Sequence, residues 1–393
     1  KPGVRRVLSD LKPGVSLIKE DSDLRITGPL GRYSRLANPH PAQRWMLEQL
    51  VRGGMSADAI CTVATSHDPS IDQARLFYLL AKLEKQHFLA FTLVDVDGRP
   101  LATVEPLDPE FALRDLDATA GTAWRLSRFA SASRVGDRMV MSSPLGHAQI
   151  VLQGSALAFT GSLARAHTLS AWAALPSMPA MDVCAGLLGV LVNAGMVFAC
   201  DAEDMIPEDR HPSLQQWEAH DLHFHYRSRW GNHDLPIGAT YRFDGHFDSL
   251  PACKAPMSAQ PIVLQRPDMD LLAKNDPPFS QVSEARRSVR QPGASPITLA
   301  ALGDFLCRSV GMRKMLLPAG QSPYEASLRP VASGGAMHDL EIYVFVNRCK
   351  GLDAGLYHYD AVHHRLEPLP VAQALCHRMF SSAMAGSATS EPS

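Results

Sequence analysis

Two arginines and a hydroxyl stand together at Arg286, Arg287 and Ser288, and Arg290 follows two residues later. Guanidinium groups hold a phosphate through charge-assisted, forked hydrogen bonds, and a hydroxyl adds a further contact. One arginine then remains for a second anionic or carbonyl group. Because arginine-rich pentapeptides also occur as solvated surface, this cluster indicates an anion site only together with other signals.

A small turn at Ser333, Gly334 and Gly335 precedes a predicted buried strand at residues 341–347. Paired glycines let a backbone approach a flat ligand closely and offer amide N–H donors, and the serine hydroxyl adds a directional contact. An ordinary tight turn has the same composition. The turn therefore predicts a flat-ligand contact only in a supporting context.

Three histidines, His220, His223 and His225, have spacings at which imidazoles can converge on zinc or iron. No nearby cysteine completes a tetrahedral set. Apolar residues alternate with the histidines, at Leu222, Phe224 and Tyr226, which predicts an extended packing segment. We therefore expect no metal here.

The elements that position these groups begin with residues 14–105. A short strand is expected at 15–18, helices around 42–51 and 57–63, and strands at 88–94 and 101–104. A third helix is indicated by leucines at i, i+3, i+4 and i+7, namely Leu76, Leu79, Leu80 and Leu83. This order predicts a winged-helix unit.

A similar order returns in residues 123–202. A hairpin is expected at 138–141 and 149–152, followed by apolar segments at 157–163 and 169–175 and a closing strand at 196–200. Residues 183–200 carry no charge and approach the length of a membrane span. Because three glycines interrupt this stretch and acidic residues flank it, we expect a buried helix and strand, and no membrane association.

Charge argues against nucleic acid as a partner. Lys and Arg total 38 against 40 Asp and Glu, a net charge of -2. The predicted third helix carries nearly cancelling charges, whereas a DNA-reading helix presents Lys and Arg to phosphates. The seven cysteines contain no CxxC pair, and the sequence opens without a charged-then-apolar leader. We expect two winged-helix units that bind no nucleic acid, in a cytoplasmic protein.

The remaining chain predicts a linker and then an α+β domain. Residues 203–283 are rich in His, Pro and aromatics, with little periodicity. Thr298 is expected to cap a helix with Leu302, Phe305 and Leu306 on one face, and residues 356–359 and 365–369 to form a hairpin. Residues 381–393 look like a loop. The predicted domains are 1–122, 123–205, 206–283 as a linker that packs on the domain after it, and 284–393 as that α+β domain.

Five segments in order resemble the nitroreductase-like flavin fold, and more closely its SagB-type dehydrogenase branch. They are WEAHDLHFHYRSR at 217–229, GATYRF at 238–243, RRSVR at 286–290, SGGA at 333–336 and GLDAGLYHYD at 351–360. The resemblance covers roughly residues 205–370. Tandem winged-helix units can precede this domain in the family's FMN-dependent peptide oxidases.

The resemblance implies roles for the clusters named above. Arg286 and Ser288, with Arg287 beside them, match residues that bind the FMN phosphate and ribityl chain, and Arg290 matches a cation near the pyrimidine edge. Ser333, Gly334 and Gly335 match a turn against the flavin of the partner subunit, which implies a homodimer. The stretch with His220 and His223 is expected near the mouth of the active site, where both are candidate substrate contacts.

Two departures from the family pattern stand out. Ala332 replaces the usual proline before the turn, and His338-Asp339 replaces Tyr-Pro after it. The family also places a Lys-Tyr pair and closing helices in a C-terminal portion expected after residue 393. The flavin domain is therefore expected to be partial, and no catalytic base is assigned.

The implied reaction oxidises a thiazoline or oxazoline in a ribosomally made peptide to the aromatic ring: a base takes the Cα proton and a hydride passes to flavin. The winged-helix units would bind the leader of the precursor peptide by strand addition, and a cyclodehydratase is a candidate partner. Two alternatives stay open: a non-catalytic peptide-binding scaffold, and a general FMN reductase of small nitro or quinone substrates.

Overall fold

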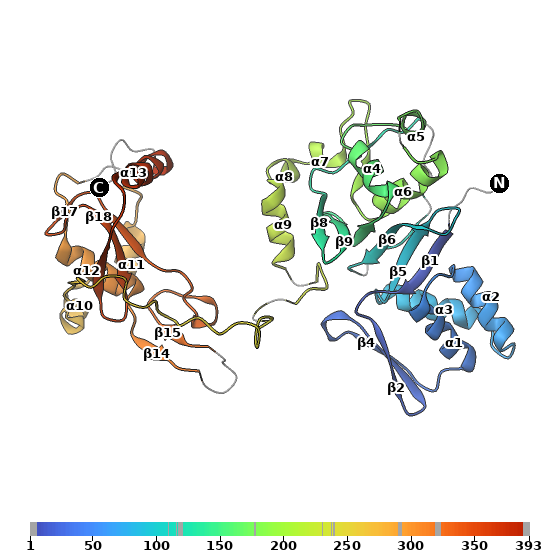
Figure 1. Ribbon diagram of the computed structural model, residues 1–393, viewed down its shortest axis with the longest axis horizontal. Helices are drawn as coiled ribbons and strands as arrows, with labels where there is room; N and C mark the ends of the chain where they lie inside the picture. Colours follow the sequence, from blue (N-terminus) through green and yellow to red (C-terminus); the bar gives the residue numbers. More distant parts are fainter. Residues whose placement is uncertain are drawn as a thin grey trace. The chain divides into compact units, whose positions relative to one another are not determined.

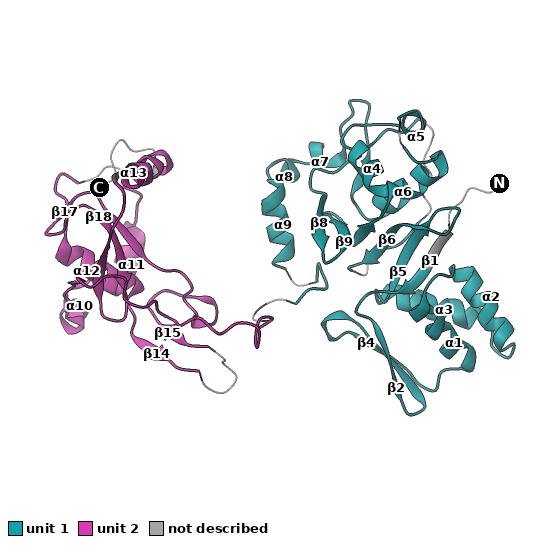
Figure 2. Cartoon of the chain, viewed as in Figure 1, with its two compact units in different colours: residues 1–240 teal, residues 241–393 magenta. Residues whose placement is uncertain are grey.

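The computed structural model divides the chain into two compact units, residues 1–240 and 241–393 (Figure 2). The boundary falls inside the segment 206–283 that was predicted as a linker. Each unit has its own hydrophobic core. The described residues are 6–108, 110–114, 116, 121–176, 178–229, 231–236, 238, 240–289, 293–318 and 324–387.

Unit 1 contains a six-stranded antiparallel sheet of order β1-β5-β6-β10-β9-β8 (Figure 1). The bounds are β1 Arg6–Leu11, β5 Leu89–Val94, β6 Pro100–Pro106, β8 Ser131–Val135, β9 Arg138–Ser142 and β10 Ala148–Leu152. Strand β6 pairs with β10 from Ala102 opposite Leu152 to Pro106 opposite Ala148.

This pairing contradicts the prediction that residues 14–105 and 123–202 form separate units, because one sheet continues through both. A lone hairpin is marginally stable and leaves unpaired backbone groups along its edges. Joining β6 to β10 pairs one edge of each predicted unit. The winged-helix character of each half remains a prediction.

Three helices and a small sheet complete the first half of unit 1. The helices are α1 Pro41–Arg52, α2 Ala57–His67 and α3 Gln73–Lys85, with the Ser56 and Asp72 side chains capping α2 and α3. The small sheet has the order β2 Ser16–Glu20, β3 Asp23–Thr27, β4 Tyr33–Leu36, with the 3-10 turn η1 Pro29–Gly31 before β4. The predicted leucine face of α3 is confirmed as buried: Leu76, Leu79, Leu80 and Leu83.

The second half of unit 1 packs helices against the same sheet, with α4 and α6 beside β6 (Figure 1). Its elements are β7 Trp124–Leu126, α4 Ser155–Ser162, α5 Leu169–Ala173, α6 Met181–Asn193 and β11 Val197–Ala199. The uncharged stretch forms the buried α6 and then β11, as predicted. Within the described residues, no helix has both the length and the apolar character to cross a bilayer.

Three short helices close unit 1: α7 Pro207–Arg210, α8 Pro212–Gln215 and α9 Ala219–Arg227. The chain is thus mixed helix and sheet, the predicted α+β class.

Unit 2 has a four-stranded antiparallel sheet of order β12-β19-β18-β16. The strands of unit 2 are β12 Ile262–Val263, β13 Ile297–Thr298, β14 Lys314–Leu316, β15 Ala326–Leu328, β16 Tyr343–Val346, β17 Cys349–Lys350, β18 Gly355–Asp360 and β19 Arg365–Leu369. Outside the four-stranded sheet, β13 pairs with β17 and β14 pairs with β15. Its helices are α10 Met269–Asn275, α11 Phe279–Ala285, α12 Leu299–Val310 and α13 Gln373–Ser387, with the 3-10 turn η2 Gly334–Ala336.

The structure confirms two local predictions in unit 2. Strands β18 and β19 form the expected hairpin. The Thr298 hydroxyl accepts a 3.1 Å hydrogen bond from the Ala301 N–H and so caps α12.

Three other predictions for unit 2 are wrong. Strand β16 lies at the sheet edge, so Tyr343 is exposed and only Val346 is buried. Phe305 of α12 is exposed, whereas Leu302 and Leu306 enter the core. Residues 381–387 continue helix α13 instead of forming a loop, since alanine and methionine there support a helix.

Candidate functional site

The segment that carries the histidines is hydrogen-bonded to the loop that follows β7. The buried Glu208 carboxylate accepts hydrogen bonds from the Ser127 hydroxyl and, at 2.7 Å, from the Arg128 N–H. The Arg128 guanidinium also donates to the Trp217 carbonyl oxygen at 3.1 Å. Residues 206–229 therefore pack on unit 1 itself.

The histidine segment forms helix α9, so the predicted extended conformation is wrong. A period of two and a period of 3.6 are hard to separate over so few residues. The charges gave a usable signal: Asp221 lies in the first turn and His225 and Arg227 in the last, which complements the helix dipole.

The helix separates the three imidazoles. His220 has an 82% exposed side chain, and its nearest charged partner is Asp221 at 3.4 Å. His223 Nε2 lies 2.7 Å from the Phe129 carbonyl oxygen, and His225 packs against Trp217 with 5.3 Å between ring centroids and a tilt of 40°. In the described part of the chain, no group of three or more His, Cys, Asp and Glu side chains is arranged to hold a metal ion.

The predicted phosphate-binding residues follow α11 in unit 2. Arg286 is the residue after the last helical turn, and the side chains of Arg286, Arg287 and Ser288 are all exposed. Their donors are thus accessible to an anion from outside. Arg290 lies outside the described residues.

The Ser333 turn is closed by its own hydroxyl, which accepts a 3.0 Å hydrogen bond from the His338 N–H. Gly335 has φ +61, and a Cβ there would lie 2.9 Å from the Tyr324 hydroxyl oxygen. Gly335 is therefore required by the turn itself. By contrast, a Cβ on Gly334 would meet nothing within 4 Å, so open space adjoins the backbone at that position.

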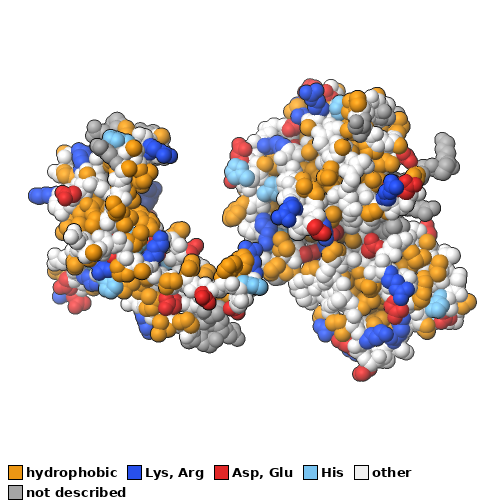
Figure 3. All heavy atoms as spheres, viewed as in Figure 1, with side chains coloured by type: hydrophobic (Ala, Val, Ile, Leu, Met, Phe, Trp, Pro, Cys, Tyr) orange, Lys and Arg blue, Asp and Glu red, His pale blue; other side chains and the backbone are white. Residues whose placement is uncertain are grey.

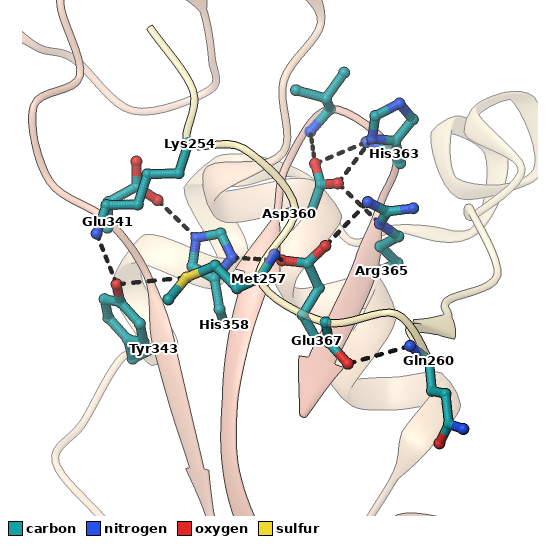
Figure 4. Close-up of polar contacts among 12 residues, drawn as sticks. Lys254, Met257, Gln260, Glu341, Tyr343, His358, Asp360, His363, Arg365 and Glu367 are labelled. Atoms are coloured by element: carbon teal, nitrogen blue, oxygen red, sulfur yellow. Dashed lines mark hydrogen bonds and ion pairs between the residues drawn. The ribbon is translucent and has the colours of Figure 1, made fainter. Parts of the chain in front are cut away.

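A buried polar network on β18 and β19 was not anticipated from the sequence (Figure 4). His358 lies between two carboxylates, with Nδ1 3.0 Å from Glu367 Oε2 and Nε2 2.8 Å from Glu341 Oε2. Glu367 also accepts from Arg365 Nη2 at 2.9 Å and from the Met257 N–H at 2.9 Å. The available signal was the cross-strand register, which places His358 directly opposite Glu367.

This network is a structural ion cluster. Both ring nitrogens of the buried His358 face carboxylate oxygens, so neither nitrogen is open to a substrate. Burial alone would raise the pKa of the fully buried Glu367, but the hydrogen bonds from His358 and Met257 and the charge of Arg365 hold that pKa below its usual value. The cluster fixes the hairpin and the segment around residue 257.

Part of unit 1 is similar to a known protein family. Residues 124–234, from β7 through α9, match the family model of the cyanobactin oxidase ThcOx. This segment resembles an oxidase.

Two curated proteins are also similar. The chain is 47% identical over 45 residues to the trifolitoxin-processing protein TfxB of Rhizobium leguminosarum bv. trifolii, covering 11% of this chain and 12% of that protein. It is 32% identical over 103 residues to MJ1384 of Methanocaldococcus jannaschii, which is named as a nitroreductase, covering 26% of this chain and 44% of that protein. The chain thus spans less than half the length of each relative.

The residues present in unit 2 fit a flavin nucleotide in their chemistry. Accessible guanidinium groups and a hydroxyl suit a phosphate and a polyol chain, and the open space beside Gly334 suits a flat ring. Among the described residues, no hydrogen bond joins the arginine cluster to the Ser333 turn.

Proposed function

We propose that this chain is part of an FMN-dependent oxidoreductase that dehydrogenates thiazolines or oxazolines in a ribosomally made peptide, of the SagB type. The match of residues 124–234 to a cyanobactin oxidase family carries the proposal. The similarities to a trifolitoxin-processing protein and to a nitroreductase support a peptide substrate and flavin chemistry respectively.

In this proposal Arg286, Arg287 and Ser288, together with Arg290, hold the phosphate and polyol of FMN. Ser333, Gly334 and Gly335 lie against the ring. When bound, FMN supplies a two-electron hydride acceptor. The exposed His220 is a candidate substrate contact, whereas His223 already lies against a backbone carbonyl and positions α9.

A homodimer is proposed because the resemblance places the Ser333 turn against a flavin of the partner subunit. Unit 2 exposes large apolar side chains, among them Phe247, Leu250, Phe279 and Leu340. Figure 3 shows hydrophobic side chains gathered over the visible face of unit 2. Surfaces of this kind are typical of subunit contacts. We further propose that the leader of the precursor peptide binds to unit 1. A cyclodehydratase is the proposed partner protein, and the proposed location is the cytoplasm.

The Arg286→Ala variant of the full-length protein is expected to bind FMN about tenfold to a hundredfold more weakly, because one charge-assisted phosphate contact contributes about 1.5 to 3 kcal/mol. The measurement is titration of FMN followed by flavin absorbance and fluorescence. Arg348→Ala, which removes an exposed arginine of the same unit, is the control and should leave affinity unchanged.

A full-length protein that purifies without colour and binds no FMN would contradict the oxidase proposal. The non-catalytic peptide-binding scaffold then takes its place. Turnover of small nitro compounds but not of azoline peptides would instead indicate a general FMN reductase.

A further inference from the structure

Unit 1 contains a cavity of about 560 Å³ between the start of β4 and the end of α3. Tyr33, Phe88 and Leu107 contribute apolar walls, and Arg32 and His87 contribute polar groups. This lining suits a ligand with an apolar body and one polar group. None of these residues takes part in the proposed flavin site.

The charge beside the cavity is positive. The Asp234 carboxylate accepts from both the buried Lys12 ammonium and the Arg32 guanidinium, so two cations share one anion. Lys85 also lines the cavity. Two further carboxylates nearby are engaged elsewhere: Glu105 with Arg138 and Gln149 at 2.6 Å each, and Asp108 with His147 at 2.7 Å. The excess charge therefore favours an anion.

The hydrogen bond between Arg32 and His87 fixes the tautomer of the imidazole. Arg32 Nη1 lies 2.8 Å from His87 Nδ1, and a guanidinium can only donate, so Nδ1 must accept. The hydrogen of the neutral ring is then on Nε2. Burial, followed by the charges of Arg32 and Lys12, lowers the pKa of His87 and favours this neutral form.

His87 Nε2 is buried and has no hydrogen-bond partner among the described residues. A buried N–H without an acceptor is costly. That nitrogen is closed to solvent, so the donors offered to a ligand in the cavity are the remaining N–H groups of Arg32, whose side chain is 33% exposed.

His87 has a backbone conformation that is usually adopted by glycine. The Phe88 N–H donates to the Leu83 carbonyl oxygen at 2.9 Å and the His87 N–H to that of Glu84 at 2.8 Å, which closes α3 in a Schellman motif. In this motif the residue after the C-cap adopts a left-handed backbone conformation, and that residue is His87, with φ +57. A non-glycine residue here is strained, and such strain commonly marks a functional position.

We propose that this cavity is a binding site for a carboxylate carried on an apolar group. Arg32, positioned by its hydrogen bond to His87 Nδ1, donates to the carboxylate, and Tyr33, Phe88 and Leu107 pack against the apolar part. Such a group can come from an acidic side chain of a peptide or from a free small acid.

The test measures binding of 3-phenylpropionate and of 3-phenylpropanamide to the full chain by calorimetry. The acid is expected to bind at least about tenfold more tightly than the amide, since only the acid offers charged acceptors. Arg32→Gln and His87→Gly should each weaken binding of the acid by about tenfold. Arg35→Gln is the matched control, because Arg35 lies on the same strand but pairs with Asp23.

The source of the carboxylate is distinguished with N-acetyl-Phe-Glu-amide and N-acetyl-Phe-Gln-amide. If N-acetyl-Phe-Glu-amide binds more tightly than both N-acetyl-Phe-Gln-amide and 3-phenylpropionate, the carboxylate comes from a peptide side chain. Binding of the free acid alone assigns it to a small molecule.

Equal binding of acid and amide, no binding of either, or an unchanged affinity in Arg32→Gln would overturn the proposal. A nitrogen-15 spectrum of labelled histidine provides a second readout that does not depend on folded variants. The His87 signal should show the hydrogen on Nε2 and shift when the acid is added. A hydrogen on Nδ1 would also overturn the proposal.

Discussion

The Glu367→Gln variant is expected to lower the free energy of unfolding of unit 2 by about 3 kcal/mol at pH 7, because it removes the anion from a buried ion cluster. The Glu367 side chain is fully buried and accepts hydrogen bonds from His358, Arg365 and the Met257 N–H. A glutamine has nearly the same shape but no charge, and its amide group donates where the carboxylate accepts.

The loss should depend on pH in a defined direction. The pKa of Glu367 is lowered in the folded protein, so its contribution to stability is fully present above the unfolded value, about 4.3. That contribution disappears as the pH falls through the lowered folded pKa. The difference in stability between wild type and Glu367→Gln should therefore be constant near neutral pH and shrink below about pH 4.

The two units can be followed separately because all five tryptophans lie before residue 241, at Trp45, Trp124, Trp172, Trp217 and Trp230. Hydrogen exchange of peptides from β18 and β19 reports on unit 2, and tryptophan fluorescence reports on unit 1. Glu367→Gln should accelerate hydrogen exchange in the β18 and β19 peptides and leave the unfolding of unit 1, followed by tryptophan fluorescence, unchanged. Asp304→Asn is the control, since Asp304 pairs with Arg308 at a half-exposed site, where a loss below about 0.5 kcal/mol is expected. An equally small effect of Glu367→Gln would show that the cluster does not stabilise the hairpin.

The Gly146→Ala variant is expected to destabilise unit 1 by about 3 kcal/mol or more, because the new methyl group would overlap backbone atoms. A Cβ on Gly146 would lie 2.0 Å from the Ala194 carbonyl oxygen. Gly195 approaches from the other side, where a Cβ would lie 2.7 Å from the Gly146 Cα and the backbone has φ +70. The loop between β9 and β10 thus touches the turn between α6 and β11 directly, and neither backbone can yield independently.

Urea denaturation followed by tryptophan fluorescence measures this effect. Gly161→Ala provides the matched control, since Gly161 lies on an exposed position of α4 with open space around it. Alanine there should raise stability by about 0.5 to 1 kcal/mol. Similar midpoints for Gly146→Ala and the wild type would mean that the two loops do not pack as described.

The sequence by itself determined the elements whose signals are local. The leucine spacing of α3, the Thr298 cap of α12 and the hairpin at residues 355–369 follow from periodicity, capping and turn chemistry. These signals act over a few residues, so no knowledge of the fold is needed to interpret them. Residues 219–227 show the limit of this approach, because so short a segment fits both an alternating and a helical pattern.

Only the tertiary structure decided which distant segments meet. The pairing of β6 with β10, the Lys12–Asp234 ion pair and the His358–Glu341 contact join residues between 17 and 222 positions apart. The arginine cluster and the Ser333 turn were proposed as parts of one site through the family resemblance, and among the described residues no hydrogen bond joins them. Long-range contacts form because they bury apolar surface and pair charges in the folded state. The sequence around each of these residues does not indicate which distant residue it will contact.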